Sequence, residues 1–299
     1  MKQLAVLSGK GGTGKTTVVA SLAHLLAPVL VVDCDVDAAN LALLLPGEDS
    51  TVFTVRSGFD ARVDVDRCTG CGACLDACRF DAIVLVAGKA TIRPLLCEGC
   101  SACSLVCPAG AVQRLPRTAG AAWLRPTAVG PLVHAELAVA QDNSGHLVTY
   151  IRDMAQRVAE RVQTSWMLLD GPPGLGCPVQ ATLAGVDRVL VVVEPSASSA
   201  ADLSRLLQLL QQLALPAAVL VNKWDIVPDA EALLGPVCAR WGVPIVAKLP
   251  HSTEVPRCLS RGQVPGCHVH SIRDGLTGVR DWLEHPQPTV PREGGGACA

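Results

Sequence analysis

The sequence has no excess of charge of either sign, no long apolar run and no leader ahead of its first predicted strand. Its 25 Lys and Arg nearly balance 27 Asp and Glu, and a net charge of -2 argues against a surface built mainly for nucleic acid. No apolar stretch approaches the length that crosses a bilayer, so we expect no stable membrane insertion. The chain runs at once into a strand and a glycine-rich loop and offers no cleavable signal. These absences lead us to expect a cytoplasmic protein that binds no nucleic acid.

Cysteine, in contrast, is abundant, with 14 in a chain of 299 residues, and so many thiols without a secretory signal indicate a reducing compartment. Eight form two runs of equal spacing, Cys68-x2-Cys71-x2-Cys74-x3-Cys78 and Cys97-x2-Cys100-x2-Cys103-x3-Cys107-Pro108. This spacing lets a tight loop aim three sulfurs at a four-iron cluster, while the last cysteine of each run completes the opposite site. The sequence therefore predicts two 4Fe-4S clusters. Their ligands would be Cys68, Cys71, Cys74 and Cys107 at the first site, and Cys78, Cys97, Cys100 and Cys103 at the second.

A zinc ribbon is the main alternative, because paired Cys-x2-Cys elements also bind zinc. A tetrahedral zinc site has no use, however, for a third cysteine at x2 and a fourth at x3 in each run. Between the runs, an apolar stretch at Ile83–Val86 and a Gly88-Lys89 turn predict a hairpin of the pseudo-twofold ferredoxin kind. Arg79 follows Cys78 where the second run has a proline, so we expect the cluster bound by Cys78 to have the higher potential.

A phosphate-binding loop follows the first predicted strand, Leu4–Ser8, and precedes an Ala-rich helix that extends to about Ala27. Glycines in such a loop let backbone N–H groups wrap phosphates. The lysine before the helix supplies charge to the outer phosphates, and the next threonine offers a hydroxyl to magnesium. The predicted nucleotide-binding residues are Gly9, Gly11, Gly12, Thr13, Gly14, Lys15, Thr16 and Thr17.

Carboxylates follow two further apolar strands, at the edge where open parallel sheets bind ligands. The first strand, Val29–Asp33, continues into Asp35 and Asp37. The second ends at Asp170, before a Gly/Pro turn, and we predict that this carboxylate holds magnesium through water. Asp33 and Asp37 are either turn residues or outer ligands of the metal.

Strands alternate with helices in the rest of the chain, with strands at Arg188–Val193, Ala217–Val221 and Ile245–Leu249 and a helix at Ala200–Leu213. This order predicts an α/β fold with a doubly wound, mostly parallel sheet. The sequence Asn222-Lys-Trp-Asp225 is similar to the guanine-reading motif of GTPases, although ATPases also place an Asn here for adenine. We favour ATP because of a second lysine, Lys10, in the phosphate loop.

With both sets of motifs in place, the chain resembles the MinD/ParA/Mrp superfamily of deviant Walker A P-loop ATPases. The resemblance is to the branch with an inserted, α+β, bacterial-ferredoxin-like domain that carries two clusters. Besides the loop and the cysteines, it rests on Asp33-Cys-Asp-Val-Asp37, Gly130-Pro-Leu-Val-His134, Asp170-Gly-Pro-Pro-Gly-Leu-Gly-Cys-Pro178 and Glu194-Pro195. It implies ATP hydrolysis by a dimer, with ATP, Mg2+ and two 4Fe-4S clusters as cofactors.

The resemblance also implies roles for individual residues. Lys10 would reach the phosphates of a partner subunit, and Asp35 would position or activate the attacking water. The implied catalytic residues are Lys10, Lys15 and Asp35, the magnesium residues are Thr16, Asp35 and Asp170, and the residues near the base are Asn222, Asp225 and Pro250. The partner would be a second copy or a paralogue, together with a redox or metal-cofactor-binding protein.

At 299 residues and 49% hydrophobic composition, the chain can hold one large domain and a small insertion. We predict an ATPase domain in two parts, 1–56 and 116–285, an insertion at 57–115 and a disordered tail at 286–299. Three functions compete: an ATP-gated electron-transfer protein, a carrier ATPase for clusters or metal cofactors, and a positioning ATPase of the MinD/ParA type. The third is disfavoured, since a basic amphipathic tail is absent from the sequence.

Overall fold

A computed structural model of the chain describes residues 1–138 and 144–285, so the predicted tail at 286–299 lies outside the described residues. The described chain divides into two compact units. The first comprises 1–52, 122–136 and 144–285, and the second comprises 53–121 with 137–138. The second unit begins four residues earlier and ends six residues later than the predicted insertion at 57–115.

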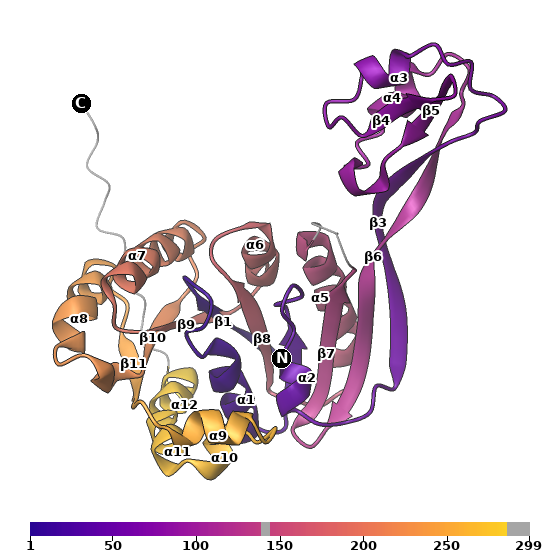
Figure 1. Cartoon of the computed structure of the whole chain (residues 1–299). Helices are drawn as coiled ribbons and strands as arrows, with labels where there is room; N and C mark the ends of the chain where they lie inside the picture. Colours follow the sequence, from indigo (N-terminus) through magenta and orange to yellow (C-terminus); the bar gives the residue numbers. More distant parts are fainter. Residues whose placement is uncertain (139–143, 286–299) are drawn as a thin grey trace, which may run out of the picture. The chain divides into compact units, whose positions relative to one another are not determined.

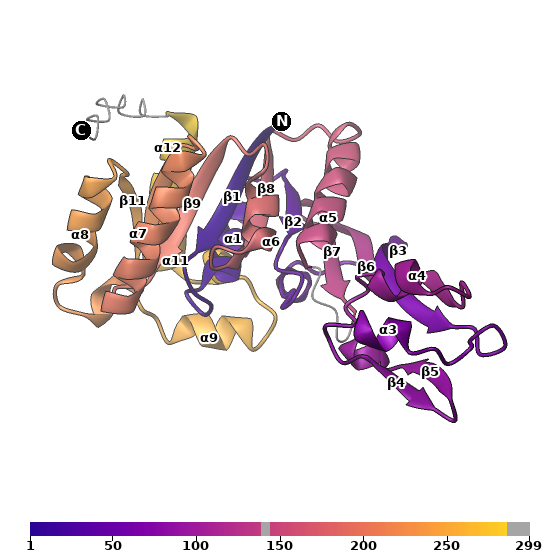
Figure 2. The same cartoon turned by 90° about the horizontal axis from the view of Figure 1, so that it is seen from above.

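The first unit is built on a sheet whose central strands are all parallel (Figures 1 and 2). Its strands are β1 (Lys2–Ser8), β2 (Leu30–Asp33), β7 (Gly130–Leu137), β8 (Trp166–Pro173), β9 (Arg188–Val193), β10 (Ala217–Asn222) and β11 (Ile245–Leu249). The full order is β11-β10-β9-β1-β8-β2-β7-β6-β3, in which β3 (Thr51–Val63) and β6 (Val112–Thr127) also run through the second unit. The prediction of a mostly parallel α/β sheet is confirmed.

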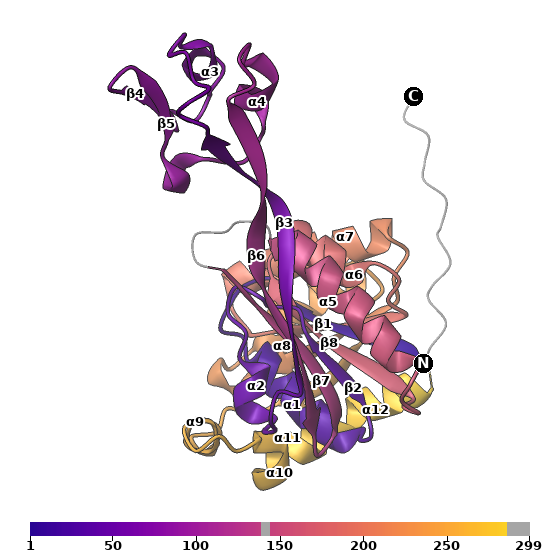
Figure 3. The same ribbon diagram turned by 90° about the vertical axis from the view of Figure 1, so that its right-hand side faces the viewer.

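Helices cover both faces of this sheet, because each right-handed crossover carries its helix to the face set by the direction of the step. In Figure 3, α5, α6 and α7 lie on the opposite side from α1, α9 and α10. The helices of the first unit are α1 (Lys15–Leu25), α2 (Leu41–Leu44), α5 (Ser144–Ala159), α6 (Cys177–Leu183), α7 (Ala197–Gln212), α8 (Ala230–Arg240), α9 (Glu254–Leu259), α10 (Pro265–His268), α11 (His270–Gly275) and α12 (Thr277–Glu284), with a 3-10 turn at Trp224–Ile226. In the described part of the chain, no helix is long and apolar enough to span a membrane.

The core between α1, the sheet and the carboxyl-terminal helices is continuous and largely apolar, with Leu4, Leu22 and Leu168 completely buried. The carboxyl-terminal segment forms two helices, α11 and α12, which meet at Leu276. Gly275 and Gly278 approach β11 so closely that a Cβ on either would collide with that strand. The glycines let the chain pack flat against the sheet edge where a continuous helix would not fit.

The second unit holds a two-stranded hairpin, β4 (Ile83–Val86) and β5 (Lys89–Ile92), and two short helices, α3 (Ala73–Asp76) and α4 (Ala102–Val106). A 3-10 turn at Pro94–Leu96 precedes the second cysteine run. The hairpin turn is Ala87-Gly88, one residue earlier than predicted, and both residues have positive φ (47° and 76°). Such a pair forms a type I′ turn, whose twist matches that of the strands.

Candidate functional site

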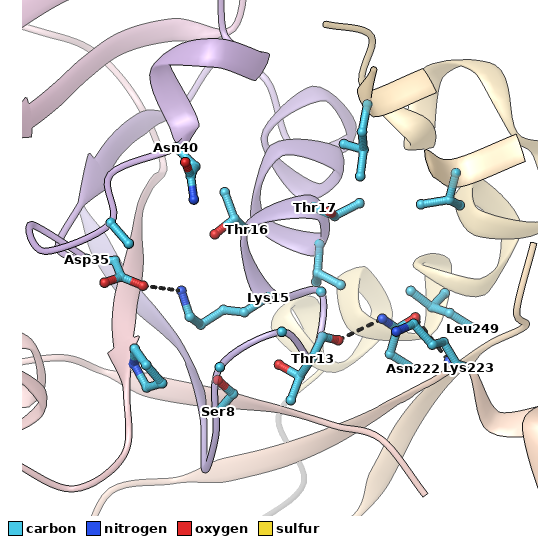
Figure 4. A pocket seen from close by; sticks show the side chains of 18 of the residues that line it. Ser8, Thr13, Lys15, Thr16, Thr17, Asp35, Asn40, Asn222, Lys223 and Leu249 are labelled. Atoms are coloured by element: carbon cyan, nitrogen blue, oxygen red, sulfur yellow. Dashed lines mark hydrogen bonds and ion pairs between the residues drawn. The ribbon is translucent and has the colours of Figure 1, made fainter. Parts of the chain in front are cut away.

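A cavity of about 740 Å3 opens in the first unit, where five parallel strands end (Figure 4). Loops that follow β1, β2, β8, β10 and β11 contribute to its lining, as expected for ligand sites of open parallel sheets. Its polar wall consists of Gly11, Gly12, Thr13, Gly14, Lys15, Thr16, Thr17, Asp35, Asp37, Asn40, Asn222 and Lys223. The cavity therefore gathers most of the residues predicted to bind the nucleotide.

The glycine-rich loop is held in its curved form by a side chain from β10. Gly12 and Gly14 have φ of 79° and 86°, a region that glycine reaches without strain. Asn222 Nδ2 donates a hydrogen bond to the Thr13 carbonyl oxygen (2.7 Å), and a Cβ on Gly14 would collide with that amide. Asn222, predicted near the base, thus braces the loop in this structure.

Lys15 points to the carboxylates, as Figure 4 shows for Asp35. Its Nζ donates to Asp170 Oδ1 at 2.6 Å and lies 3.6 Å from Asp35 Oδ2. Burial opposes the charged ammonium, but the carboxylates of Asp170, Asp35 and Asp33 together outweigh that penalty and raise the pKa of Lys15. Burial also raises the pKa of Asp35, against the effect of Lys15.

The second oxygen of Asp170 is buried and, within the described residues, accepts no hydrogen bond; the same is true of Thr13 Oγ1. A buried carboxylate oxygen without a partner is costly, and a metal-bound water would satisfy it. Asp170, Asp35 and Thr16 supply only oxygen ligands, which is the donor set that Mg2+ prefers. These residues therefore fit a magnesium ion together with a triphosphate.

Asp33 proves to be an organiser of the turn after β2 and lies beneath the cavity. It is fully buried, and its Oδ2 accepts from the backbone N–H groups of Asn40 and Leu41 (3.2 and 3.1 Å). Its Oδ1 accepts from Asp35 N at 3.2 Å. Burial, and next the charge of Asp170, raise the pKa of Asp33 to about 7. Asp37, in contrast, lines the cavity.

Four residues predicted for the nucleotide or its magnesium do not line the cavity: Gly9, Lys10, Asp170 and Asp225. Lys10 Nζ donates to Ser196 Oγ at 3.4 Å, and Gly9 packs so closely on Asp202 that a Cβ would come within 2.5 Å of its Cβ. Asp225 Oδ1 accepts from His251 N at 2.6 Å and so fixes the loop that carries Pro250, which does line the cavity.

An apolar wall on the cavity was not predicted. It is formed by Leu249, Val255, Pro256, Leu259 and Ile272. Val255 and Leu259 are four residues apart on α9, and this i,i+4 spacing is the feature of the sequence that could have indicated the apolar wall. The helix is only six residues long, too short for its periodicity to stand out in the sequence.

Two smaller cavities in the second unit are each lined by four cysteines. The first is lined by Cys68, Cys71, Cys74 and Cys107, and the second by Cys78, Cys97, Cys100 and Cys103. Each set takes three cysteines from one run and the last cysteine of the other run. In the described ranges, no three Cys, His, Asp or Glu side chains are grouped so as to hold a single metal ion. The eight thiols, soft ligands around two separate cavities, fit iron–sulfur clusters.

The two cysteine loops repeat one another in backbone geometry. Gly70 and Gly99, two residues after the first cysteine of each run, have positive φ, and a Cβ on either would overlap a backbone carbonyl. Two residues later come Gly72 and Ser101, again with positive φ (84° and 65°), directly before α3 and α4. The shared turns direct the cysteines of each loop toward one cavity.

The remaining described cysteines are mostly packing residues. Burial raises the pKa of Cys34 to about 12 and that of Cys238 to about 11, so neither is a ready thiolate. Cys177 is exposed at the first residue of α6. His134 is buried, stacks on Trp123 and lies 3.0 Å from Asp49 Oδ1, which makes it a satisfied structural histidine.

Comparison with known families gives one match that covers most of the chain. The family described as "CobQ/CobB/MinD/ParA nucleotide binding domain" matches residues 4–265. The uncharacterized protein MJ0578 of Methanocaldococcus jannaschii is 37% identical over 227 residues, which is 74% of this chain and 78% of that protein. The indolepyruvate oxidoreductase subunit IorA of Methanothermobacter marburgensis is 43% identical over 56 residues, only 19% of this chain and 9% of that subunit.

Solved structures share the fold at low sequence identity. The septum site-determining protein MinD of Pyrococcus horikoshii, complexed with Mg-ADP, superposes with a TM-score of 0.56 at 17% identity, covering 95% of this chain and 96% of its own. The MinC:MinD cell division complex of Aquifex aeolicus gives 0.57 at 18% identity, covering 98% of this chain and 99% of its own.

Proposed function

Since the chain belongs to the CobQ/CobB/MinD/ParA nucleotide-binding family and is a P-loop ATPase of the MinD/ParA type, we propose that its second unit makes it an iron–sulfur ATPase. Its nucleotide state would gate electron transfer from two 4Fe-4S clusters to a protein or metal-cofactor partner. The observation that carries the proposal is the pair of cavities, each lined by four cysteines drawn from both runs. An ATPase has no need of such sites for hydrolysis, so they call for a second activity.

ATP fits the cavity of the first unit at both ends. The loop at Gly11–Thr17 faces one end with backbone N–H groups, and the apolar wall at Leu249 and Val255 offers the other end to a base. Asp225, which would read guanine, does not line the cavity, and its Oδ1 accepts from the His251 N–H, which favours adenine. The Mg-ADP in the Pyrococcus MinD structure accords with this choice.

On nucleotide binding, Lys15 must exchange partners. Its ammonium is paired with Asp170 in this structure, and the outer phosphates are the competing anion. Asp170, released by Lys15, would hold magnesium, which would supply positive charge to neutralise the phosphates. Asp35, 3.6 Å from the same ammonium, is then free to orient a water for attack. Thr16 offers its hydroxyl from the first turn of α1.

A dimer, of two copies or of this chain with a paralogue, would complete the site. Lys10 does not line the cavity of its own subunit and rests on Ser196 at the start of α7, so its ammonium is available to phosphates of another subunit. Two relatives, MJ0578 and MJ0579, occur in one organism, which accords with a paralogous pair. The test is the molar mass in solution with Mg-ATP. A Lys10→Ala protein that dimerises and hydrolyses ATP as the wild type does would rule out the role.

The decisive experiment is anaerobic EPR of the reduced protein with and without Mg-ATP, with iron and sulfide analysis. We expect two interacting clusters whose spectrum changes with ATP. Cys100→Ser should remove one of them. Cys177→Ser, an exposed cysteine outside both sets, is the matched control and should keep both. Colourless protein that contains zinc would overturn the proposal and leave only the ATPase.

The carrier function remains the second candidate, because one cysteine of each set, Cys71 and Cys100, is exposed. An exposed ligand opens a route for cluster transfer as well as for electrons. The two functions differ in cluster lability. Clusters that pass to an apo-acceptor protein on ATP hydrolysis would favour the carrier, whereas clusters that stay bound through many turnovers would favour electron transfer.

A further inference from the structure

We propose that the two cysteine sites are unequal and that Lys89 makes the first site, Cys68, Cys71, Cys74 and Cys107, the one of higher reduction potential. The inference rests on the proposed function, because it concerns how this chain would tune the clusters. It assigns to Lys89 a positioning and tuning role that the sequence motifs do not indicate.

Lys89 lies against a ligand of the first site. It opens β5, and its Nζ donates a hydrogen bond to the carbonyl oxygen of Cys68. The side chain is partly buried, and among the described residues no carboxylate lies within ion-pair distance of its ammonium. A full positive charge is therefore held next to a cluster ligand without a compensating anion.

The second site has a cation at the equivalent place, but this one is paired. Arg117 Nη2 donates to the carbonyl oxygen of Cys97 at 2.7 Å, and its Nε donates to Asp60 Oδ1 at 2.5 Å. A second acid, Glu98, lines the cavity directly after Cys97. Two acids, Asp60 and Glu98, thus offset the charge of Arg117 near the second site.

A hydrogen bond to a ligand sulfur acts in the same direction. Cys107 Sγ, at the first site, accepts from Ala111 N at 3.3 Å. N–H donors and positive charge both stabilise the extra electron of a reduced cluster, so both favour the first site.

This ordering reverses the one expected from Arg79 in the sequence. Arg79 is exposed, where water and salt screen its charge, whereas Lys89 is partly buried and fixed on a ligand carbonyl. The other flank of Cys68 holds two acids, Asp64 and Asp66, and one base, Arg67. Asp66 and Arg67 are exposed, where water screens their charges, and their backbone N–H groups donate to Asp64 Oδ1. An electron that enters the pair would therefore come to rest at the first site.

The test is an EPR-monitored redox titration of the cluster-loaded full chain. Wild type should show two midpoint potentials. Lys89→Gln should lower the higher one, on the order of a tenfold change in the reduction equilibrium, or about 59 mV for one electron, and leave the lower one in place. Lys89→Arg keeps the charge and should restore the wild-type value. Arg117→Gln should leave the higher potential unchanged.

A second variant, away from the Lys89 contact, keeps the inference testable if Lys89→Gln fails to bind its cluster. Glu98→Gln is an exposed change at the second site and should raise the lower potential alone. Equal potentials in the wild type, or a shift of the lower potential in Lys89→Gln, would overturn the inference while the proposed function stands. Protein without iron or an EPR signal would overturn both.

Discussion

At the scale of single residues, the nucleotide site of this structure is held together by a buried ion pair. Lys15 and Asp170 are 6% and 0% exposed, and their charged atoms are 2.6 Å apart. Sequence motifs assign one residue to phosphate and the other to magnesium, and they do not predict that the two residues pair with each other. The pairing depends on β1 and β8 being neighbours, which follows from tertiary structure alone.

Lys15→Met should destabilise the nucleotide-free protein by about 3 kcal/mol, because it leaves the Asp170 carboxylate buried and unpaired. Urea unfolding without nucleotide measures this effect separately from the expected loss of ATPase activity. Lys10→Met is the matched control, since that lysine is half-buried and makes one long hydrogen bond, to Ser196. Equal stability of the two variants would contradict the prediction.

The buried carboxyl of Asp33 predicts a dependence of stability on pH. Its pKa is raised from 3.8 to about 7, so the folded protein keeps a proton that the unfolded chain has lost within this window. The free energy of unfolding should therefore fall as pH rises from about 4 to about 7. In Asp33→Asn this slope should flatten, even though the variant also loses N–H bonds at Asn40 or Leu41. Urea unfolding midpoints of the wild type and of Asp33→Asn, measured between about pH 4 and pH 7 without nucleotide, test this prediction. If the midpoints of the two proteins change in parallel with pH, the prediction is wrong.

At the scale of elements, the cysteine loops are defined by glycines whose neighbours the sequence does not reveal. Gly70 and Gly72 both have positive φ, but only at Gly70 would a Cβ overlap another backbone, at the carbonyl of Gly88 in the β4–β5 turn. The cysteine spacing predicts the tight turn within each run, because such a turn follows from local sequence. The contact between Gly70 and the β4–β5 turn, which is 18 residues away in the sequence, could not be predicted from local sequence.

Gly70→Ala should remove the cluster of the first site, whereas Gly72→Ala should keep it. Both substitutions meet the backbone strain of positive φ, about 1 kcal/mol, and they differ only in the clash with the Gly88 carbonyl. Iron content and EPR of the two purified proteins provide the comparison. Loss of the cluster in both variants would show that backbone strain alone, and not the docked hairpin, decides.

Ser101→Gly should stabilise the second cysteine loop by about 0.5–1 kcal/mol. Ser101 occupies the left-handed region (φ 65°) where the first loop has a glycine, and glycine removes the steric cost of Cβ there. Denaturant-induced bleaching of the cluster absorbance measures the change, with Gly72→Ser as the reciprocal variant of opposite sign. A decrease in stability would show that the Ser101 side chain contributes more than its backbone costs.

At the scale of the whole molecule, the chain joins its two units through long strands that local patterns do not define well. The insertion was predicted at 57–115, whereas the second compact unit spans 53–121 with 137–138. The difference arises because β3 and β6 are 13 and 16 residues long and belong to both units. Alternation of side chains along these strands is irregular, so neither strand carries a boundary signal comparable to the spacing of the cysteines.

Strand β6 offers a covalent route between nucleotide and clusters, and Arg125 connects that strand to the nucleotide side. Its Nη1 donates to the carbonyl oxygen of Ala42 in α2 at 2.8 Å, and Asp49 holds the guanidinium by two bonds of 2.9 and 3.1 Å. Helix α2 begins where the carboxylate of Asp33 accepts from Leu41 N, directly after the loop that lines the cavity. At its other end, Val112 of β6 lines the first cysteine site.

Arg125→Met should therefore leave ATP hydrolysis and both clusters in place but abolish the change that Mg-ATP produces in the EPR spectrum of the reduced protein. A ligand biases a distant element only through contacts that differ between the two states, and the Ala42–Arg125 bond joins α2, directly after the cavity loop, to β6. Arg114→Met, in the same strand but exposed and stacked on Phe59, is the matched control and should retain the ATP effect. If Arg125→Met also retains it, coupling does not pass through β6 from α2.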